Sequence, residues 1–585
     1  MVRFLCVAVL GILLTVSVGR AQPVDAPQMS LAALKPGMRG EVWTVFRGTT
    51  PESFAVEVTG IVRNALGPGK SLILCQLTDE RVQKMGAVAG MSGSPLYIEG
   101  KLAGALSYQV QKFETVRYAG FTPISDLLEV GQQSDIAATM AAPQASGVAA
   151  LQAGQTSDGL QPLSPVFAFG GVAPRVVEWL APQFKALGLQ VSALGGQVDP
   201  TAEDPTAATT LRAGDAVAVA VASGDITLAA TGTVSYVDGD RVLAFGHPMM
   251  GLGTVSLPMA RAEIVTILPS NESSLKVANT GAIIGTIDQD RLSAVAGKLG
   301  PGPKMIPVEI LVDRMAQPPR TLNFMAARHP QLTPLAVGAG AAQAVMGSND
   351  AGFTNGARLQ ADFIFADNAT VSTTALLSGS QGVTQGLGDF TRDVSTLLQN
   401  PYAAVFPTAI NVRVTPLEEN PLTILEFVQL SRNVVTANDT LEVTIGWRDY
   451  QGNTGREVVS VPVAADWQGK NLELVVTNGG GLDQLTGRNA TIASAQLRGF
   501  SAYLDFVRQA RSPDGLFVAV VESARLFLDQ TTETRELPGS LARIAQRSDQ
   551  TRYQQRNAFT PLWENHILLG RLVPGVLRKP FQVGD

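Results

Sequence analysis

Short apolar runs of strand length, each ended by turn residues, recur along most of this 585-residue chain. Residues 42–46, 71–77 and 231–237 are rich in Val, Ile, Leu and Thr, and an Asp-Gly pair at 238–239 leads into a returning run at 241–245. Apolar or alternating runs of roughly four to eight residues, bounded by turn residues, are typical of strands and hairpins. The 58 glycines and 34 prolines supply turns at the density that such a fold needs. We therefore predict a mainly β fold.

Composition shifts and turn signals divide the chain into several parts. A stretch at 131–162 is rich in Ala, Gln, Ser and Gly and is typical of a linker. Strand-like runs between 406 and 480, separated by turns, favour an immunoglobulin-like β-sandwich. The predicted parts are 1–21, 31–130, 131–162, 163–310, a β-rich region at 311–405, 406–480, and a mixed α/β region at 481–585 with an amphipathic helix over 496–511.

The first 21 residues have the pattern of a secretory signal peptide. Arg3 gives a positive start, residues 4–18 are almost entirely apolar, and residues 19–21 read Gly-Arg-Ala, a small-residue cleavage site. The apolar run is shorter than the roughly 20 residues of a spanning helix, which leaves a retained anchor as the alternative. We expect export to the periplasm, the envelope surface or the medium, with no membrane span after signal removal.

Cysteine, histidine and charge content restrict the chemistry of the mature chain. It keeps one cysteine, Cys75, so no internal disulfide can form and the apolar core must hold the fold. Cys75 lies in an apolar run and is expected to be a buried small hydrophobe. The net charge is −6, and acidic and basic residues are interspersed along the chain, so no basic cluster of the kind that binds nucleic acid is evident. Three scattered histidines and one cysteine predict no metal site, and we expect no cofactor.

Residues 90–95, which read Gly-Met-Ser-Gly-Ser-Pro, can present a serine hydroxyl in a tight turn. Gly90 and Gly93 flank Ser92 and can adopt backbone angles that other residues resist. In such a turn the N–H groups of Gly90 and Ser92 can converge on one point and form an oxyanion hole for acyl transfer. The alternative is a Gly/Ser turn that only connects two strands.

A serine hydroxyl is a weak nucleophile and needs a general base. His247 follows a predicted strand within Phe-Gly-His-Pro at 245–248, whereas His329 and His566 lack a glycine-rich setting. We therefore predict His247 as the base. A lone histidine is more often structural, and only tertiary folding can bring His247 to a serine so distant in sequence.

A third group should orient the imidazole and fix its tautomer. Asp79 ends a predicted strand in the segment that carries Ser92. Asp225 and Asp238, the latter close to His247 in sequence, are the alternatives. For each aspartate taken alone, a turn or a helix cap is the more common role.

Taken together, these motifs resemble the SpoIVB (stage IV sporulation protein B) peptidase family. The serine motif and the hairpin after it carry most of the resemblance, and the Gly-His-Pro motif adds to it. The matching segments are residues 90–95, Tyr-Ile-Glu-Gly-Lys at 97–101, Gly-Ala at 104–105, Ala-Phe-Gly-His-Pro at 244–248 and Gly-Thr-Ile at 285–287.

The resemblance spans about residues 31–310 and implies a chymotrypsin-like serine peptidase with a double β-barrel. By motif match, Ser92 would be the nucleophile and His247 the general base. The family's aspartate lies shortly before its serine, a placement that Asp79 approximates. The serine turn is also similar to the Gly-Asp-Ser-Gly-Gly-Pro turn of chymotrypsin-like enzymes, which supports the Gly90 and Ser92 amides as the oxyanion hole.

Two features depart from the family pattern. The Gly-His-Pro motif precedes the serine motif in the sporulation peptidase, whereas the order here is Asp79, Ser92, His247. A circularly permuted arrangement would preserve the site, because geometry and not chain order defines a triad. No PDZ domain is recognisable, and the C-terminal half has no counterpart in the family.

We therefore expect an exported serine endopeptidase that acts by acyl transfer on peptide or protein substrates. Self-processing is included in this expectation, with the linker at 131–162 as an exposed segment for cleavage. The alternative is a catalytically inactive envelope binding or scaffold protein built on a peptidase fold. An intact pair of Ser92 and His247 argues for the enzyme.

Overall fold

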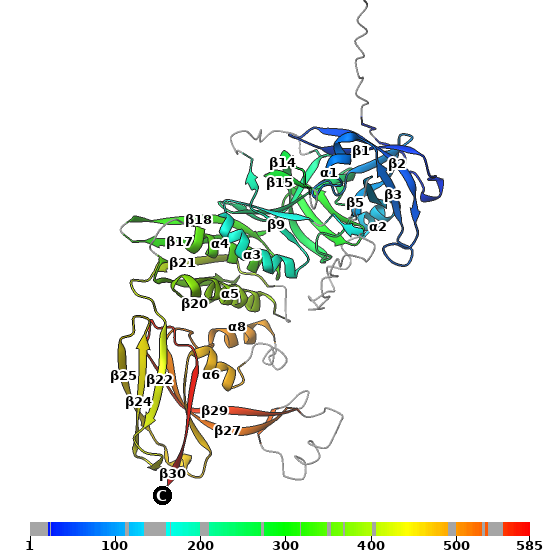
Figure 1. The fold of residues 1–585 in the computed structure, drawn as a ribbon. Coiled ribbons are helices and arrows are strands. Elements are labelled where there is room, and N and C mark those ends of the chain that lie inside the picture. Colours follow the sequence, from blue (N-terminus) through cyan, green and yellow to red (C-terminus); the bar gives the residue numbers. More distant parts are fainter. Residues whose placement is uncertain are drawn as a thin grey trace, which may run out of the picture.

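The computed structural model contains two β-barrels, a sheet covered by helices, and a C-terminal pair of sheets (Figure 1). The predicted signal peptide at 1–21, and most of the predicted linker at 131–162, lie outside the described residues. The structure describes residues 22–23, 25–110, 116–133, 160–163, 165–198, 210–270, 274–315, 317–347, 353–366, 369–400, 405–488, 499–528, 533–535 and 554–584.

The first barrel, drawn in blue in Figure 1, is a ring of antiparallel strands. Pairing runs in the order β4-β1-β2-β3-β6-β5, and β5 pairs back with β4. Alternate residues such as Phe54, Val56 and Val58 point into its core, which also holds Cys75 as a buried residue. The strands are β1 (Arg39–Val45), β2 (Pro51–Val62), β3 (Leu72–Leu77), β4 (Pro95–Ile98), β5 (Lys101–Val110) and β6 (Tyr118–Pro123), with helices Leu31–Ala33, α1 (Glu80–Met85) and α2 (Ile124–Gln132) beside them.

The second barrel closes in the same way. Pairing runs β11-β14-β15-β16-β13-β12, and β12 pairs back with β11. The hairpin predicted from residues 231–245 is present, with Asp238 paired to Arg241. A mainly β fold is thus confirmed. The strands are β11 (Ala216–Gly224), β12 (Thr227–Asp238), β13 (Arg241–Ala244), β14 (Gly253–Leu268), β15 (Leu275–Arg291) and β16 (Ala294–Leu299).

Small side chains allow the two barrels to approach each other closely. Val45 of β1 packs among alanines of the second barrel, including Ala218, Ala229 and Ala260. Helix α2 packs on the same barrel through the apolar cluster that contains Leu243. Two isolated backbone bridges cross the contact, Gly48 with Ile264 and Ala89 with Leu275. The loops that leave the barrels at this contact are therefore held against each other.

A helix-covered sheet continues from the second barrel through the pairing of β18 with β11. Its strands are β17 (Met305–Arg314), β18 (Gln317–Ala327), β19 (Gly356–Ile364), β20 (Thr370–Ser378) and β21 (Ala409–Pro416). Shorter strands earlier in the chain extend the barrel sheets instead: β7 (Leu160–Pro162) pairs with β5, β8 (Val166–Gly170) with β12, β9 (Gln190–Ser192) with β8, and β10 (Gly195–Gln197) with β15. The helices are α3 (Pro174–Ala186), α4 (Leu332–Ala342), the π-helical turn Gln343–Gly347 and α5 (Gly379–Leu398).

Two expectations for this region need correction. Residues 311–405 are not only β-rich, because α4 and α5 cover the sheet there. Every residue of α4 is buried, so the helix lacks the apolar stripe by which amphipathic helices are recognised. Strand β21, which lies within the range predicted for the sandwich, pairs with β17 and β19 instead.

The C-terminal unit consists of two sheets that share one apolar core. Val443 and Val459 of one sheet lie in the same buried cluster as Leu474 and Val518 of the other. An immunoglobulin-like sandwich within 406–480 is not confirmed, because strands up to the C-terminus complete the second sheet. One sheet contains β22 (Thr423–Leu430), β24 (Thr440–Asp449) and β25 (Thr454–Pro462); the other contains β23 (Val434–Thr436), β26 (Leu472–Thr477), β27 (Leu516–Leu528), β28 (Glu533–Arg535), β29 (Gln554–Ile567) and β30 (Val576–Gly584).

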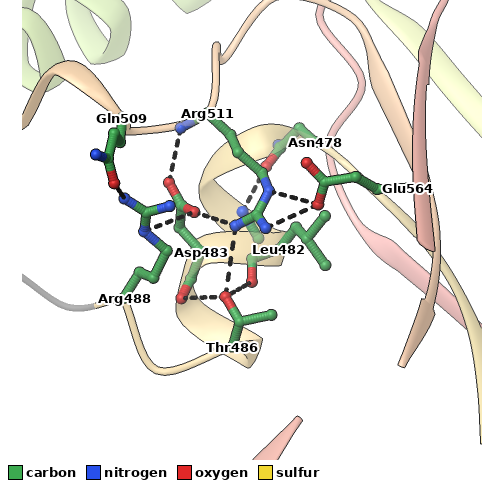
Figure 2. Close-up of polar contacts among 9 residues, drawn as sticks. Asn478, Leu482, Asp483, Thr486, Arg488, Gln509, Arg511 and Glu564 are labelled. Atoms are coloured by element: carbon green, nitrogen blue, oxygen red, sulfur yellow. Dashed lines mark hydrogen bonds and ion pairs between the residues drawn. The ribbon is translucent and has the colours of Figure 1, made fainter. Parts of the chain in front are cut away.

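Helices α6 (Gly479–Leu485) and α8 (Phe500–Arg508) accompany these sheets, together with a short turn at Ala465–Trp467. Helix α8 corresponds to the amphipathic helix predicted over 496–511, of which 496–498 lie outside the described residues. Figure 2 shows how Arg511 joins α6 to β29. Its guanidinium lies between Asp483 and Glu564, at 2.8 Å from the Glu564 carboxylate, and its side chain is only 9% exposed.

Candidate active site

Ser92 lies in the loop between α1 and β4, where the first barrel touches the second. Gly90 and Gly93 have φ values of 97° and 95°, which favour glycine. A Cβ on Gly93 would lie 2.0 Å from Thr233 O and 2.5 Å from Phe245 N. The glycine is therefore required, and it brings the serine loop into direct contact with the segment that leads to His247.

Backbone hydrogen bonds anchor the serine loop to both barrels. The Ser92 carbonyl accepts a bond from Thr233 N at 2.8 Å, and Gly93 N donates to Leu106 O at 2.7 Å. Within the described residues, the N–H groups of Gly90 and Ser92 have no acceptor. Within these ranges, the amides predicted for the oxyanion hole are therefore not bonded to the protein, but both residues are buried.

The segment before His247 is bent by two consecutive left-handed residues. Phe245 has a φ of 68° and Gly246 a φ of 69°. Such angles are costly for a bulky residue and persist only where the surroundings enforce them. Thr122 of the first barrel donates its hydroxyl to Gly246 O at 2.7 Å. The bend thus places His247 at the contact between the barrels, beside the strand β5 that follows the serine motif.

His247 is fully buried and presents one unoccupied nitrogen. Nδ1 lies 2.8 Å from Pro248 O, and because a carbonyl only accepts, Nδ1 carries the proton in this arrangement. Nε2 has no hydrogen-bond partner in the described part of the chain. Burial lowers the pKa of His247 to about 4, against the opposing effect of the main chain at Pro248 and Leu163. The imidazole is then neutral at pH 7, as a general base must be.

Ser92 and His247 are brought to the same contact, but they are not hydrogen-bonded to each other. The Ser92 Oγ is buried and, like His247 Nε2, has no partner among the residues described. Catalytic hydrogen bonds are often long in the absence of substrate and shorten when it binds. Ser92 Oγ and His247 Nε2 are thus both buried with unused hydrogen-bonding capacity.

Asp79 is not hydrogen-bonded to His247. It caps α1, where its carboxylate accepts from Arg81 N at 2.9 Å and pairs with the Arg81 side chain. Burial works to raise the pKa of Asp79, but the hydrogen bonds and charge of Arg81 outweigh it, so the pKa is lowered. Asp225 accepts from Asn323 N at 2.7 Å. The imidazole Nδ1, which a triad aspartate would hold, is bonded to a backbone carbonyl instead.

The other two histidines lie apart from the serine loop. His329 accepts from Gln331 N at the start of α4, and its pKa is lowered to about 4 by burial. His566 stacks on Phe517 in the C-terminal unit, with ring centroids 4.2 Å apart. Of the histidines weighed from sequence, His247 is the one at the serine loop.

Asp290 supports the His247 loop, and sequence reasoning missed it. This residue of β15 is 1% exposed and accepts from the amides of Met249, Met250 and Leu252 at 2.7, 2.9 and 3.0 Å. Burial raises its pKa, while these amide bonds oppose the shift. A carboxylate held by three backbone donors fixes the loop that follows His247. Its only signal in the sequence is a charged residue within a strand-like run.

Lys276 is a second buried polar residue at this contact that the sequence did not reveal. It is 4% exposed, and its Nζ donates to Thr44 Oγ1 at 2.8 Å. Thr44 Oγ1 lies 3.5 Å from Thr233 Oγ1, which donates to Gly90 O at 3.1 Å. Burial lowers the pKa of Lys276 to about 7. The lysine is thus linked through two hydroxyls to the peptide group that begins the serine turn.

The segment after the predicted linker also lies near the contact between the two barrels. β7 pairs with the end of β5, and the next residue, Leu163, donates its N–H to Ser107 O at 2.9 Å. The Leu163 side chain is 1% exposed and belongs to the apolar cluster of the first barrel that includes Met91 and Leu106.

Comparison with known proteins agrees with the serine motif. Residues 15–121 match the SpoIVB peptidase S55 family, which confirms the resemblance for this part of the chain and points to a serine peptidase family. The matched residues include Asp79, Gly90 and Ser92 but not His247. No curated protein and no solved structure matches the chain.

The described residues contain neither a cluster of metal ligands nor a membrane-spanning helix. Over the ranges that the structure describes, no group of three or more His, Cys, Asp or Glu is arranged to hold a metal ion. Within the same ranges, none of the helices has the length and apolar character needed to cross a bilayer.

Proposed function

We propose that this chain is an exported serine endopeptidase that acts by acyl transfer on peptide or protein substrates. The single observation that carries the proposal is that the serine turn and the Gly-His-Pro segment, distant in sequence, contact each other through Gly93 and Phe245. The family match over the serine motif supports it. Export is proposed from the signal-like residues 1–21.

The proposed architecture is a chymotrypsin-like double barrel in circularly permuted order. In support, β1 to β6 and β11 to β16 each pair in a closed ring. The serine motif lies on the first ring and His247 on the second, which reverses the order of the motifs in the family. A triad depends on geometry, so this order is compatible with activity.

In the proposed reaction, Ser92 Oγ attacks the substrate carbonyl carbon while His247 Nε2 takes the hydroxyl proton. The N–H groups of Gly90 and Ser92 stabilise the oxyanion, the peptide C–N bond breaks, and His247 returns the proton to the leaving amine. Water then hydrolyses the acyl-enzyme by the same proton transfers. Pro248 O fixes the imidazole tautomer in this scheme, and we assign Asp79 no part in it.

The proposal is tested with a serine-directed fluorophosphonate probe and with casein digestion. Ser92→Ala should abolish labelling, and His247→Ala should slow labelling and digestion by at least about a thousandfold. The matched controls are Ser235→Ala, because Ser235 is also buried without a hydrogen-bond partner among the described residues, and His329→Ala, because burial lowers the pKa of that partly buried imidazole as well. If the Ser92 and His247 variants behave like wild type, the assignment is wrong.

The same samples test self-processing and the alternative function. N-terminal sequencing of the purified wild type against Ser92→Ala would reveal any cut that depends on Ser92. A chain that is never labelled, yet binds a peptide or an envelope component, would favour the inactive scaffold. The complete burial of Ser92 and His247 is the observation that keeps this alternative in view.

A further inference from the structure

The segment that leads from the linker into the second half of the chain forms an extra strand on the first barrel. β7 runs antiparallel to β5, with Pro162 opposite Tyr108 and Gln161 opposite Gln109. The register continues to Leu163, whose N–H bonds to Ser107 O at 2.9 Å. An extended peptide that adds a strand to a sheet is a general mode of peptide recognition, in which backbone bonds supply affinity and side-chain pockets supply specificity.

This strand ends at the candidate nucleophile and base. Leu163 is opposite Ser107, and Leu106, the neighbour of Ser107, accepts the hydrogen bond from Gly93 N in the serine loop. A Cβ on Gly246 would lie 3.3 Å from Ser107 Cβ. The main chain of Leu163 is also close enough to His247 to influence its pKa. Leu163 is therefore bordered by the serine loop on one side and by the imidazole on the other.

The side chain of Leu163 packs into the apolar core of the first barrel. It is almost fully buried in the cluster that contains Met91, next to Ser92 in sequence, and Leu106. Leu160 and Gln161, by contrast, are partly exposed. Among the described residues of the segment, only Leu163 has a buried side chain, as expected for a peptide that is recognised mainly through one side chain.

We infer that β7 and Leu163 occupy the substrate strand of the Ser92 site, and that the substrates are extended peptides with an apolar side chain at the position of Leu163. This inference rests on the proposed function. The tethered segment explains why Ser92 and His247 are both buried: the place of the substrate is filled by the chain itself. A substrate gains access only when it replaces this strand.

The chemistry follows the same geometry. A peptide that takes the place of the segment presents the carbonyl of its apolar residue to Ser92 Oγ. The bond after that residue breaks, the new amine takes the proton held by His247, and water releases the acyl group. Because Leu163 belongs to the apolar cluster that contains Met91 and Leu106, an aspartate at that position would lose apolar burial and bury a charge without a partner.

The first test measures how fast the fluorophosphonate labels Ser92. Leu163→Asp should expel the segment and raise the labelling rate about tenfold or more over wild type, because the competent fraction of molecules increases. Leu163→Met is the conservative control and should label at the wild-type rate. Equal rates for Leu163→Asp and wild type would overturn the inference and leave the proposed function intact.

A second variant covers the possibility that Leu163→Asp does not fold. Gln161→Pro removes a backbone donor from the pairing with Gln109 without touching the core, because proline cannot donate to a ladder. It should also raise the labelling rate. No labelling of wild type, Leu163→Met or Gln161→Pro would contradict the proposed function itself, and the inference with it.

The second test supplies the segment as a separate peptide. A synthetic peptide of residues 157–167 should be cut after the leucine by the Gln161→Pro enzyme, and its Leu→Asp analogue should be cut at least about a hundredfold more slowly. Mass spectrometry identifies the broken bond. An enzyme that labels at Ser92 and digests casein, yet treats both peptides alike, would show that Leu163 does not mark the specificity pocket.

Discussion

At the scale of single residues, Lys276 is the most unusual group near the candidate site. An amine taken out of water is disfavoured in its charged form, and Lys276 has one described partner, the neutral hydroxyl of Thr44. Its stem packs against Gly90, with its Cβ 3.0 Å from where a Gly90 Cβ would be. The residue therefore lowers the stability of the fold at neutral pH while it contacts the serine turn.

The pH dependence of stability should report this lysine. The folded pKa is about 7, whereas a lysine in the unfolded chain titrates near 10.4, so between these values the unfolded state binds more protons. The free energy of unfolding then rises with pH across this window, by roughly 1.4 kcal/mol per pH unit at most. Lys276→Met should remove that rise and increase stability at pH 7.

Urea titrations at a series of pH values from 6 to about 10 measure the effect. Lys101→Met serves as the control, because Lys101 is exposed at the start of β5 and should leave the slope unchanged. A Lys276→Met protein with the same pH slope as wild type would contradict the assignment of a depressed pKa to this lysine.

At the scale of elements, the serine turn depends on the contact between the barrels. Gly93→Ala would place a methyl group 2.0 Å from Thr233 O, and the obstructing atoms are backbone that cannot turn away. We expect it to lower the free energy of unfolding by about 3 kcal/mol or more and to abolish probe labelling of Ser92.

The matched control for this element is Gly100→Ala in the turn between β4 and β5. Gly100 also has a positive φ, 75°, but nothing lies within 4 Å of an added Cβ. Gly100→Ala should lower the free energy of unfolding only through backbone strain, by about 1 kcal/mol. Equal destabilisation of the two variants, measured by urea denaturation, would show that the barrel contact is not the cause.

At the scale of the whole molecule, few polar contacts join the C-terminal unit to the helix-covered sheet. Arg358 of β19 pairs with Asp514 at 3.2 Å, and the carboxylate of Asp514 is only 11% exposed. Phe500 of α8 meets Phe365 at a centroid distance of 5.5 Å. Leu504 of α8 also lies in the buried cluster of the helix-covered sheet, so the interface combines an apolar contact with these polar ones.

Arg358→Met should weaken that coupling, because it leaves a mostly buried carboxylate without its cation. We expect the thermal transition of the C-terminal unit to separate from the rest and its stability to fall by about 1–3 kcal/mol. Calorimetry measures both effects. Arg392→Met is the control, since Arg392 is 72% exposed and pairs within α5. A single unchanged transition would mean that Arg358 does not hold the units together.

Part of this organisation could be predicted from local patterns. Alternation, turn residues and glycine content predicted the mainly β fold and the hairpin at 231–245, because strand period and turn chemistry are encoded within a few residues. The helices α4 and α5 were missed for different physical reasons. Helix α4 is apolar on all sides and displays no stripe. Helix α5 does bury a stripe that includes Val383, Leu387 and Phe390, but its many Gly, Ser and Thr residues have low helix propensity and obscured the pattern.

Neighbouring residues were enough to identify the turn that carries the serine and the histidine with a glycine-rich setting. Tertiary structure alone decided that these segments meet, that Asp79 caps a helix, and that Asp290 and Lys276 support the loops. It also decided that Leu163 pairs with Ser107 of β5 and packs into the cluster that contains Met91. Such contacts depend on how two closed barrels pack through small side chains, and this packing involves residues too far apart in sequence for any local pattern to specify.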